Sequence, residues 1–283
     1  MTNLGNIRPL TGFIGAEIGG IDLRAVGPEE VSAIRGAWLE HQVLFFPDQH
    51  LSPDELVAAG AKFGEIDPPH GGLEHHPDNS NVMLAVSRNG EGSSKYNDIW
   101  HADVTFDTTP PMASMLQAVT LPPLGGDTLF ASMYAAWEAL SPKLQDAVEG
   151  LQAFHDGVPN FMPYLLDPGT ENGPERLRKL KAEQPGAIHP LVVRHPETGR
   201  KALYVNRAFT VRIMGLSEIE SRNLLNLLVE HCEQPSFQVR WRWSEGDIAF
   251  WDNRCALHHA VKDFGRADRL MTRVTLKGAR PAS

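Results

Sequence analysis

The chain has 283 residues, of which 42% are hydrophobic and 22% are charged, and its formal net charge is -9. This composition is that of an ordinary globular protein, and a β-rich chain of this length often forms one domain, so we expect a single domain over residues 1–283. The negative charge argues against a nucleic-acid surface. No apolar run approaches a membrane span, and residues 1–5 lack signal-peptide features, so we expect a cytoplasmic protein with no membrane partner.

The first 63 residues predict strands and two helices. Residues 7–23 alternate apolar and small positions broken by glycines, which suggests strands bending at a sheet edge. Pro28-Glu29-Glu30 opens an amphipathic helix, and residues 42–46 are an apolar run typical of a buried strand. Ser52-Pro53-Asp54-Glu55 has the form of a capping box, which predicts a second helix to about Phe63.

Residues 66–97 are rich in Pro, Gly, His and Asn and contain one good strand candidate, Val82 to Val86. Long irregular stretches in compact domains are often functional lids, so we expect a substrate-facing lid here. His70, His75 and His76 lie in it, and each of them suits an exposed loop histidine equally well. A second insert of the same kind is expected over residues 157–187, with a basic, solvated helix over residues 175–184.

The remaining chain predicts short strands with helices outside them. Residues 112–120 and 151–156 read as strands, and residues 132–150 read as helix in two pieces. Turn residues predict two β-hairpins, and Ser217-Glu218-Ile219-Glu220 predicts another capped helix. The hairpins pair residues 189–194 with 201–206 and residues 237–243 with 248–251. We therefore expect a mainly β fold with flanking helices, a distorted double-stranded β-helix or jelly roll.

A metal site is the chemistry that the sequence favours. His101 and Asp103 are two residues apart on an extended segment, so their side chains point to one side and can hold one atom. His-x-Asp alone is weak, because it also suits a histidine at a strand end with an ordinary hydrogen bond. A third ligand from far along the chain, His258, would complete the two-histidine, one-carboxylate set of non-haem Fe(II) oxygenases. His259 is the rival third ligand.

Two arginines follow this segment. Arg269 and Arg273 share one face of a predicted strand. Guanidinium groups directed at one interior are costly unless anions pair with them, and their planar fork suits a carboxylate. The pair therefore predicts one anionic cosubstrate and one anionic substrate.

Four motifs in this order resemble the taurine dioxygenase family of Fe(II)/2-oxoglutarate-dependent oxygenases, and the resemblance runs nearly end to end. It implies iron ligation by His101, Asp103 and His258. It also implies 2-oxoglutarate binding by Thr128 and Arg269, and contact between Arg273 and the substrate anion. The motifs are Trp100-His101-Ala102-Asp103-Val104-Thr105-Phe106, Gly125-Gly126-Asp127-Thr128, Trp251-Asp252-Asn253-Arg254 with His258, and Arg269 to Arg273.

The resemblance also implies four further substrate contacts, at His70, Asn97, Phe161 and Phe209. Taurine-specific members supply a histidine and a tyrosine from the first insert, but no tyrosine lies between His70 and Lys95 here. Segments 132–138 and 189–193 resemble aryloxyalkanoate dioxygenases as much as taurine dioxygenases.

The resemblance implies Fe(II), 2-oxoglutarate and O2 as cofactor and cosubstrates. The expected reaction is hydroxylation of a small anionic organic molecule, a sulfonate such as taurine with release of sulfite. It is coupled to decarboxylation of 2-oxoglutarate to succinate and CO2. The alternatives are the same chemistry on an aryloxyalkanoate or an alkyl sulfate ester, a zinc-dependent hydrolase, and a non-catalytic jelly-roll binding protein. Members of this family form homodimers or homotetramers, which is the assembly we expect.

Overall fold

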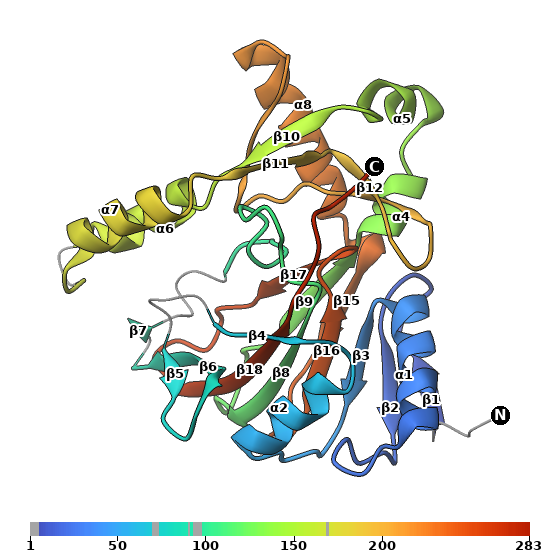
Figure 1. Cartoon of the computed structure of the whole chain (residues 1–283), viewed down its shortest axis with the longest axis vertical. Coiled ribbons are helices and arrows are strands. Elements are labelled where there is room, and N and C mark those ends of the chain that lie inside the picture. Colours follow the sequence, from blue (N-terminus) through green and yellow to red (C-terminus); the bar gives the residue numbers. More distant parts are fainter. Residues whose placement is uncertain (1–5, 70–73, 90, 93–97, 168–169) are drawn as a thin grey trace.

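The computed structural model describes residues 6–69, 74–89, 91–92, 98–167 and 170–283. Two antiparallel sheets stacked face to face form its centre, with helices outside them (Figure 1). The mainly β, jelly-roll architecture expected from the sequence is therefore confirmed. Within the described residues, no helix is long and apolar enough to cross a membrane.

The larger sheet collects strands from both ends of the chain. Its order is β1-β2-β3-β16-β8-β18-β6-β5, with β4 beside β18 and β7 beside β6, and only the pair β2–β3 is parallel. The strands are β1 (Asn6–Pro9), β2 (Ala16–Gly19), β3 (Val43–Phe46), β4 (Ile66–Asp67), β5 (His75–His76), β6 (Asn79–Arg88), β7 (Glu91–Gly92), β8 (Ala113–Thr120), β16 (Ile248–Asp252) and β18 (Arg269–Leu276).

The smaller sheet has the order β15-β9-β17, formed by β15 (Gln238–Trp241), β9 (Thr128–Ser132) and β17 (Ala256–Ala260). The expected hairpin between residues 237–243 and 248–251 is wrong. β15 pairs with β9, whereas β16 pairs with β3 and β8 in the larger sheet. Residues 244–247 do turn the chain, but they carry it from one sheet to the other.

Strands buried on both faces explain the continuous apolar runs. In β3, Val43 and Phe45 face the core between the sheets, while Leu44 and Phe46 face the core beneath the helices. This alternation follows from the period of two along a strand. Across the sheets, Phe45 meets Phe130 of β9 edge to face, with ring centroids 5.6 Å apart.

Two helices cover the outer face of the larger sheet. They are α1 (Pro28–His41) and α2 (Pro53–Ala61), and their proline starts match the expectation. The α2 capping box is present: Ser52 Oγ accepts from the amide of Glu55, whose carboxylate accepts from the Ser52 amide. Trp38 of α1 stacks on Phe250 of β16 at 4.7 Å.

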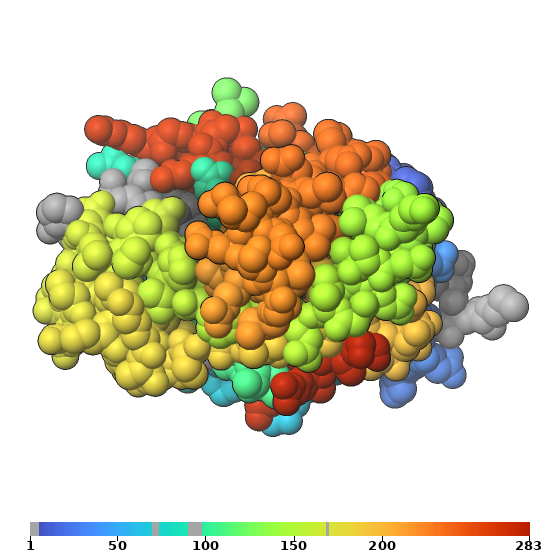
Figure 2. Space-filling model, turned by 90° about the horizontal axis from the view of Figure 1, so that it is seen from above, coloured from blue at the N-terminus to red at the C-terminus, as the bar shows by residue number. Residues whose placement is uncertain are grey.

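The remaining elements surround the smaller sheet. In the view of Figure 2, α8 (orange) and the segment with α6 and α7 (yellow) form the visible upper face. A three-stranded sheet, β11-β10-β14, and the predicted hairpin β12–β13 belong to the same part of the fold (Figure 1). These elements are α4 (Met133–Glu138), α5 (Pro142–Val148), β10 (Gln152–His155), α6 (Val158–Leu165), α7 (Gly173–Glu183), β11 (Ala187–Pro190), β12 (Val192–Arg194), β13 (Lys201–Leu203), β14 (Thr210–Ile213), α8 (Glu218–Cys232) and the 3-10 helix η1 (Pro235–Phe237).

Candidate active site

The three predicted metal ligands meet at the open end of the two sheets. His101 and His258 form an antiparallel bridge, with amide-to-carbonyl distances of 3.0 and 2.8 Å, so His101 extends the smaller sheet beside β17. One ligand atom from each of His101, Asp103 and His258 lies within 4.8 Å of the other two, and all three residues are buried. A set of two imidazoles and one carboxylate at this spacing suits a divalent metal such as iron.

The protonation states of these side chains suit metal binding. Burial lowers the pKa of His101 and lowers that of His258 well below its usual value, so both imidazoles are neutral at pH 7. Burial raises the pKa of Asp103, but the charge of Arg273 and the hydrogen bond from Ser114 outweigh it, and the pKa is held below its usual range. Metal ligands must be neutral imidazoles and ionised carboxylates, so these three side chains can bind a metal without a change in protonation state.

Hydrogen bonds orient His101 and Asp103. His101 donates from Nδ1 to the Ile99 carbonyl at 2.7 Å, which leaves Nε2 for a metal. Asp103 Oδ2 accepts from Ser114 Oγ at 2.8 Å and from Asn253 Nδ2 at 3.2 Å. His258 differs, because its buried Nδ1 has no hydrogen-bond partner among the described residues. Asn253, from the Trp251-Asp252-Asn253-Arg254 motif, thus orients the Asp103 carboxylate and not His258.

Backbone strain accompanies Asp103. Val104, the next residue, has a φ of 52°, which a β-branched side chain adopts only when its surroundings enforce it. Thr105 anchors the far side: its Oγ1 accepts from Asn206 Nδ2 at 3.0 Å, and its carbonyl accepts from His189 Nε2 at 3.0 Å. The loop that carries Asp103 is thus clamped to the surrounding structure on both sides.

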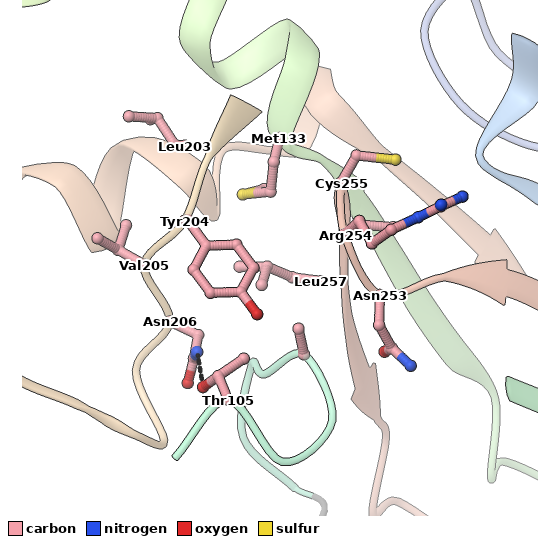
Figure 3. A pocket seen from close by; sticks show the side chains of 12 residues that line it. Thr105, Met133, Leu203, Tyr204, Val205, Asn206, Asn253, Arg254, Cys255 and Leu257 are labelled. Atoms are coloured by element: carbon pink, nitrogen blue, oxygen red, sulfur yellow. Dashed lines mark hydrogen bonds between the residues drawn. The ribbon is translucent and has the colours of Figure 1, made fainter. Parts of the chain in front are cut away.

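A small cavity lies behind this loop (Figure 3). Its volume is about 10 Å³, which is room for about one water molecule. Tyr204 lies across it with its hydroxyl directed toward the loop of Thr105. This cavity is too small for a substrate, so it belongs to the support of the metal loop.

Arg269 is a buried cation that forms no ion pair with a carboxylate among the described residues. Its Nη2 donates to the Gly126 carbonyl at 3.1 Å, and its Nε has no partner among the described residues. Burial lowers its pKa to about 10, with Asp127 as the opposing charge. A buried guanidinium in this state favours an anionic ligand. Thr128, two residues after Gly126, is also buried, and its hydroxyl accepts from the indole of Trp243 at 3.0 Å. This corner can therefore hold the carboxylate of a cosubstrate.

Arg273 lies on the metal side of β18. Its Nη1 donates to Asp103 Oδ1 at 2.8 Å, and its Nε has no partner among the described residues. His258 Nε2 is 3.8 Å from the same carboxylate oxygen. The two arginines therefore face the same interior, as the spacing predicts, but Arg273 contacts a candidate metal ligand directly.

Three aromatic rings form one wall next to His101. Phe209 lies 6.0 Å from the His101 ring, and Phe106 lies 4.9 Å from Phe209 and 5.9 Å from Phe161, all measured between ring centroids. The structure thus brings Phe161 and Phe209 together near the metal ligands. Phe106 was not singled out from the sequence, although it lies only three positions after Asp103.

Several predicted residues do not join this group. His70 and Asn97 lie outside the described residues. His75 and His76 bond within their own hairpin, to the Ser80 carbonyl and the Asp78 amide. His259, the rival ligand, pairs with Asp98 at 2.9 Å instead of joining His101 and Asp103.

A second cluster, His195, Asp252 and Cys255, also has metal-like spacing. The atoms of His195 and Asp252 that could bind a metal are already in hydrogen bonds. Asp252 accepts from both Arg254 and His195, and His195 Nδ1 accepts the amides of Glu197 and Thr198. Burial also raises the pKa of the Cys255 thiol well above its usual value. This cluster is therefore a buried ion-pair network and does not suit a metal.

Comparison with known proteins points to one family. The family model described as "Taurine catabolism dioxygenase TauD, TfdA family" matches residues 6–275. An alkylsulfatase from Acinetobacter baylyi is 37% identical over 96% of this chain and 84% of its own length. An (S)-phenoxypropionate/alpha-ketoglutarate-dioxygenase from Sphingobium herbicidovorans is 34% identical over 90% of this chain and 89% of its own.

A similar crystal structure supports the same grouping. It is that of AAD-2 in complex with Mn(II) and N-oxalylglycine, which matches with a TM-score of 0.86 and 27% identity. The match covers 98% of this chain and 99% of the other.

Proposed function

Because the chain belongs to the TauD/TfdA family of Fe(II)- and 2-oxoglutarate-dependent dioxygenases, we propose that it hydroxylates a small anionic sulfonate or sulfate ester at the site described above. The observation that carries this proposal is the grouping of His101, Asp103 and His258 within 4.8 Å. Family membership decides against a zinc hydrolase and against a non-catalytic binding protein.

We assign the metal to the two neutral imidazoles and the Asp103 carboxylate. Bound there with 2-oxoglutarate, the metal supplies the activation of O2 that is coupled to formation of succinate and CO2. The side chains of this protein supply position and exclusion of water. Ser114 and Asn253 hold Asp103 Oδ2, which leaves Oδ1 directed toward His258 and Arg273.

The cosubstrate is assigned to Arg269 and Thr128. The buried Arg269 guanidinium, whose Nε has no partner among the described residues, and the buried Thr128 hydroxyl support binding of its far carboxylate. The substrate anion is assigned to Arg273, and the apolar body of the substrate to the wall of Phe106, Phe161 and Phe209. An apolar wall beside a cation orients a molecule that is charged at one end only.

The two inserts are proposed as lids of one domain over residues 1–283. Phe161 belongs to α6 of the second insert and contacts the site aromatics, which supports that role for residues 157–187. For the first insert, residues 66–97 with His70 and Asn97, the family resemblance is the support. From the same resemblance we propose a homodimer or homotetramer in the cytoplasm.

A second substrate class has its own support. The phenoxypropionate dioxygenase is 34% identical over most of both chains, and segments 132–138 and 189–193 favour the same group. An aryloxyalkanoate also combines one anion with an apolar ring.

The test is an anaerobic titration with Fe(II) and 2-oxoglutarate, followed by succinate release with sulfonates, sulfate esters and aryloxyalkanoates. We expect the weak visible charge-transfer band of an iron-bound keto acid, and succinate with at least one anionic class. Asp103→Asn should abolish both signals, whereas Asp107→Asn, on the exposed side of the same loop, should leave them unchanged. An Asp103→Asn protein with a normal band and turnover would contradict the ligand assignment.

A further inference from the structure

A buried indole contacts the hydroxyl assigned to the cosubstrate. Trp243 Nε1 lies 3.0 Å from Thr128 Oγ1, and the exposed fractions of the two residues are 8% and 2%. An indole N–H donates and cannot accept, so the oxygen of Thr128 is the acceptor in this bond. The direction of the bond is therefore fixed by chemistry.

This direction decides what the Thr128 hydroxyl can do next. A hydroxyl has one hydrogen, and with the indole already donating to its oxygen that hydrogen is available for another acceptor. Thr128 begins β9, and the Gly126 carbonyl two residues earlier accepts from Arg269. An anion paired with Arg269 at this corner is the natural acceptor.

The surroundings make Trp243 a rigid support. It packs in the core between the two sheets, in the same cluster as Phe45 and Trp251. It lies just beyond β15, the strand that pairs with β9 and places Trp241 opposite Thr128. A hydroxyl that accepts one hydrogen bond also becomes a better donor in the next, so the indole both orients and polarises it.

We propose that Trp243 is a positioning residue for 2-oxoglutarate: its indole fixes the Thr128 hydroxyl as a donor to the far carboxylate of the cosubstrate. The inference rests on the proposed function, since it takes Arg269 and Thr128 as the cosubstrate site. It adds a residue that touches neither metal nor cosubstrate.

The test measures 2-oxoglutarate binding to the Mn(II)-loaded protein by anaerobic calorimetry. Trp243→Phe keeps the ring and removes the N–H, and we expect the dissociation constant to rise about three- to tenfold, the worth of about one hydrogen bond. The matched control is Trp241→Phe, two positions earlier in the chain, which removes an indole hydrogen bond to Asp247 and should change the constant less than about twofold.

Coupling separates positioning from general destabilisation. Thr128→Val should weaken 2-oxoglutarate binding at least as much as Trp243→Phe, and the double variant should bind no more weakly than Thr128→Val alone. The Michaelis constant for the anionic substrate that is hydroxylated, as distinct from 2-oxoglutarate, should not change in Trp243→Phe. Additive losses, an equal loss in Trp241→Phe, or unchanged binding in Trp243→Phe would each overturn the inference.

Two further results keep the outcome decisive. If Trp243→Phe does not fold, the indole resonance of Trp243 should shift on addition of 2-oxoglutarate to the wild type and not to Thr128→Val; an equal shift in both overturns the inference. A wild-type protein that does not bind 2-oxoglutarate overturns the proposed function instead.

Discussion

His155 is buried as a neutral imidazole beside His189 and Tyr204. Its Nδ1 meets Thr105 Oγ1 at 3.0 Å, and its Nε2 has no partner among the described residues. Burial and the neighbouring His189 lower the pKa of His155 to about 3. The residue therefore supports the metal loop while resisting protonation.

Acid should destabilise the protein through this residue. In the unfolded chain the imidazole takes up a proton near pH 6.5, whereas in the folded protein it does so only near pH 3. The stabilisation is thus complete above pH 6.5 and is lost as the pH falls toward 3, by about 1.4 kcal/mol per pH unit.

Urea unfolding between pH 7 and pH 5 measures this slope. We expect a shallower pH dependence of the unfolding free energy in His155→Gln than in the wild type. His50→Gln, a change at an exposed histidine outside the metal loop, is the control for the loss of an imidazole. Equal slopes in the wild type and His155→Gln would mean that His155 has the same pKa in the folded and unfolded states.

The residues of the metal group could be predicted from the sequence because their signal is local. His101 and Asp103 lie two positions apart in the sequence, and the resemblance favoured His258. Ser114 could not be found in this way. It contacts Asp103 because β8 lies beside β16, and a serine within an apolar run carries no sign of that neighbour.

At the scale of elements, one ion-pair network joins helix α1, the hairpin β12–β13 and the end of β16. Arg254 donates to Asp252 and to Glu197, and Glu197 also pairs with Arg35 of α1. Asp252 is fully buried, and burial raises its pKa, but the hydrogen bonds from Arg254 and His195 outweigh this and lower it.

Removing the charge of Asp252 should therefore be costly. Asp252→Asn leaves Arg254 without its buried partner, and we expect a loss of about 3 kcal/mol in the free energy of unfolding. Glu197→Gln, a change at a partly exposed carboxylate, should cost about 1 kcal/mol or less. Urea titration of the two variants checks this prediction. Equal losses in unfolding free energy would show that the partly exposed Glu197 contributes as much to the network as the buried Asp252.

Element boundaries followed the sequence where capping chemistry is local, and failed where the partner is distant. Ser52 and Ser217 both accept the expected amide hydrogen bonds at their helix starts. Residues 244–247 form a turn, as their composition indicates. A turn sequence predicts only that the chain changes direction. Whether the next strand pairs with the previous one or joins another sheet depends on the rest of the fold.

At the scale of the molecule, the order of strands ties the two ends of the chain together. β18, the last strand, lies between β8 and β6, and β3 near the start pairs with β16 near the end. These long-range pairings could not be read from periodicity, which gives the buried face of a strand and not its neighbours.

The central place of β18 makes the C-terminus indispensable. Deletion of residues 269–283 removes a strand with a neighbour on each side together with both arginines, so we expect no cooperative unfolding transition in circular dichroism. Deletion of residues 281–283 removes the hydrogen bond from the Arg194 amide to the Ala282 carbonyl and should preserve a cooperative transition. A cooperative transition in the longer deletion would show that the sheet closes without β18.

The contact between Arg273 and Asp103 sets an order of events. While the guanidinium neutralises that carboxylate, it is not free for a visitor of the same charge as Asp103. A divalent cation bound beside Asp103 would repel the Arg273 guanidinium and weaken its hydrogen bond to that carboxylate. We therefore expect iron binding to free Arg273 for the substrate anion. The iron-loaded protein should bind the substrate more tightly than the apoprotein does.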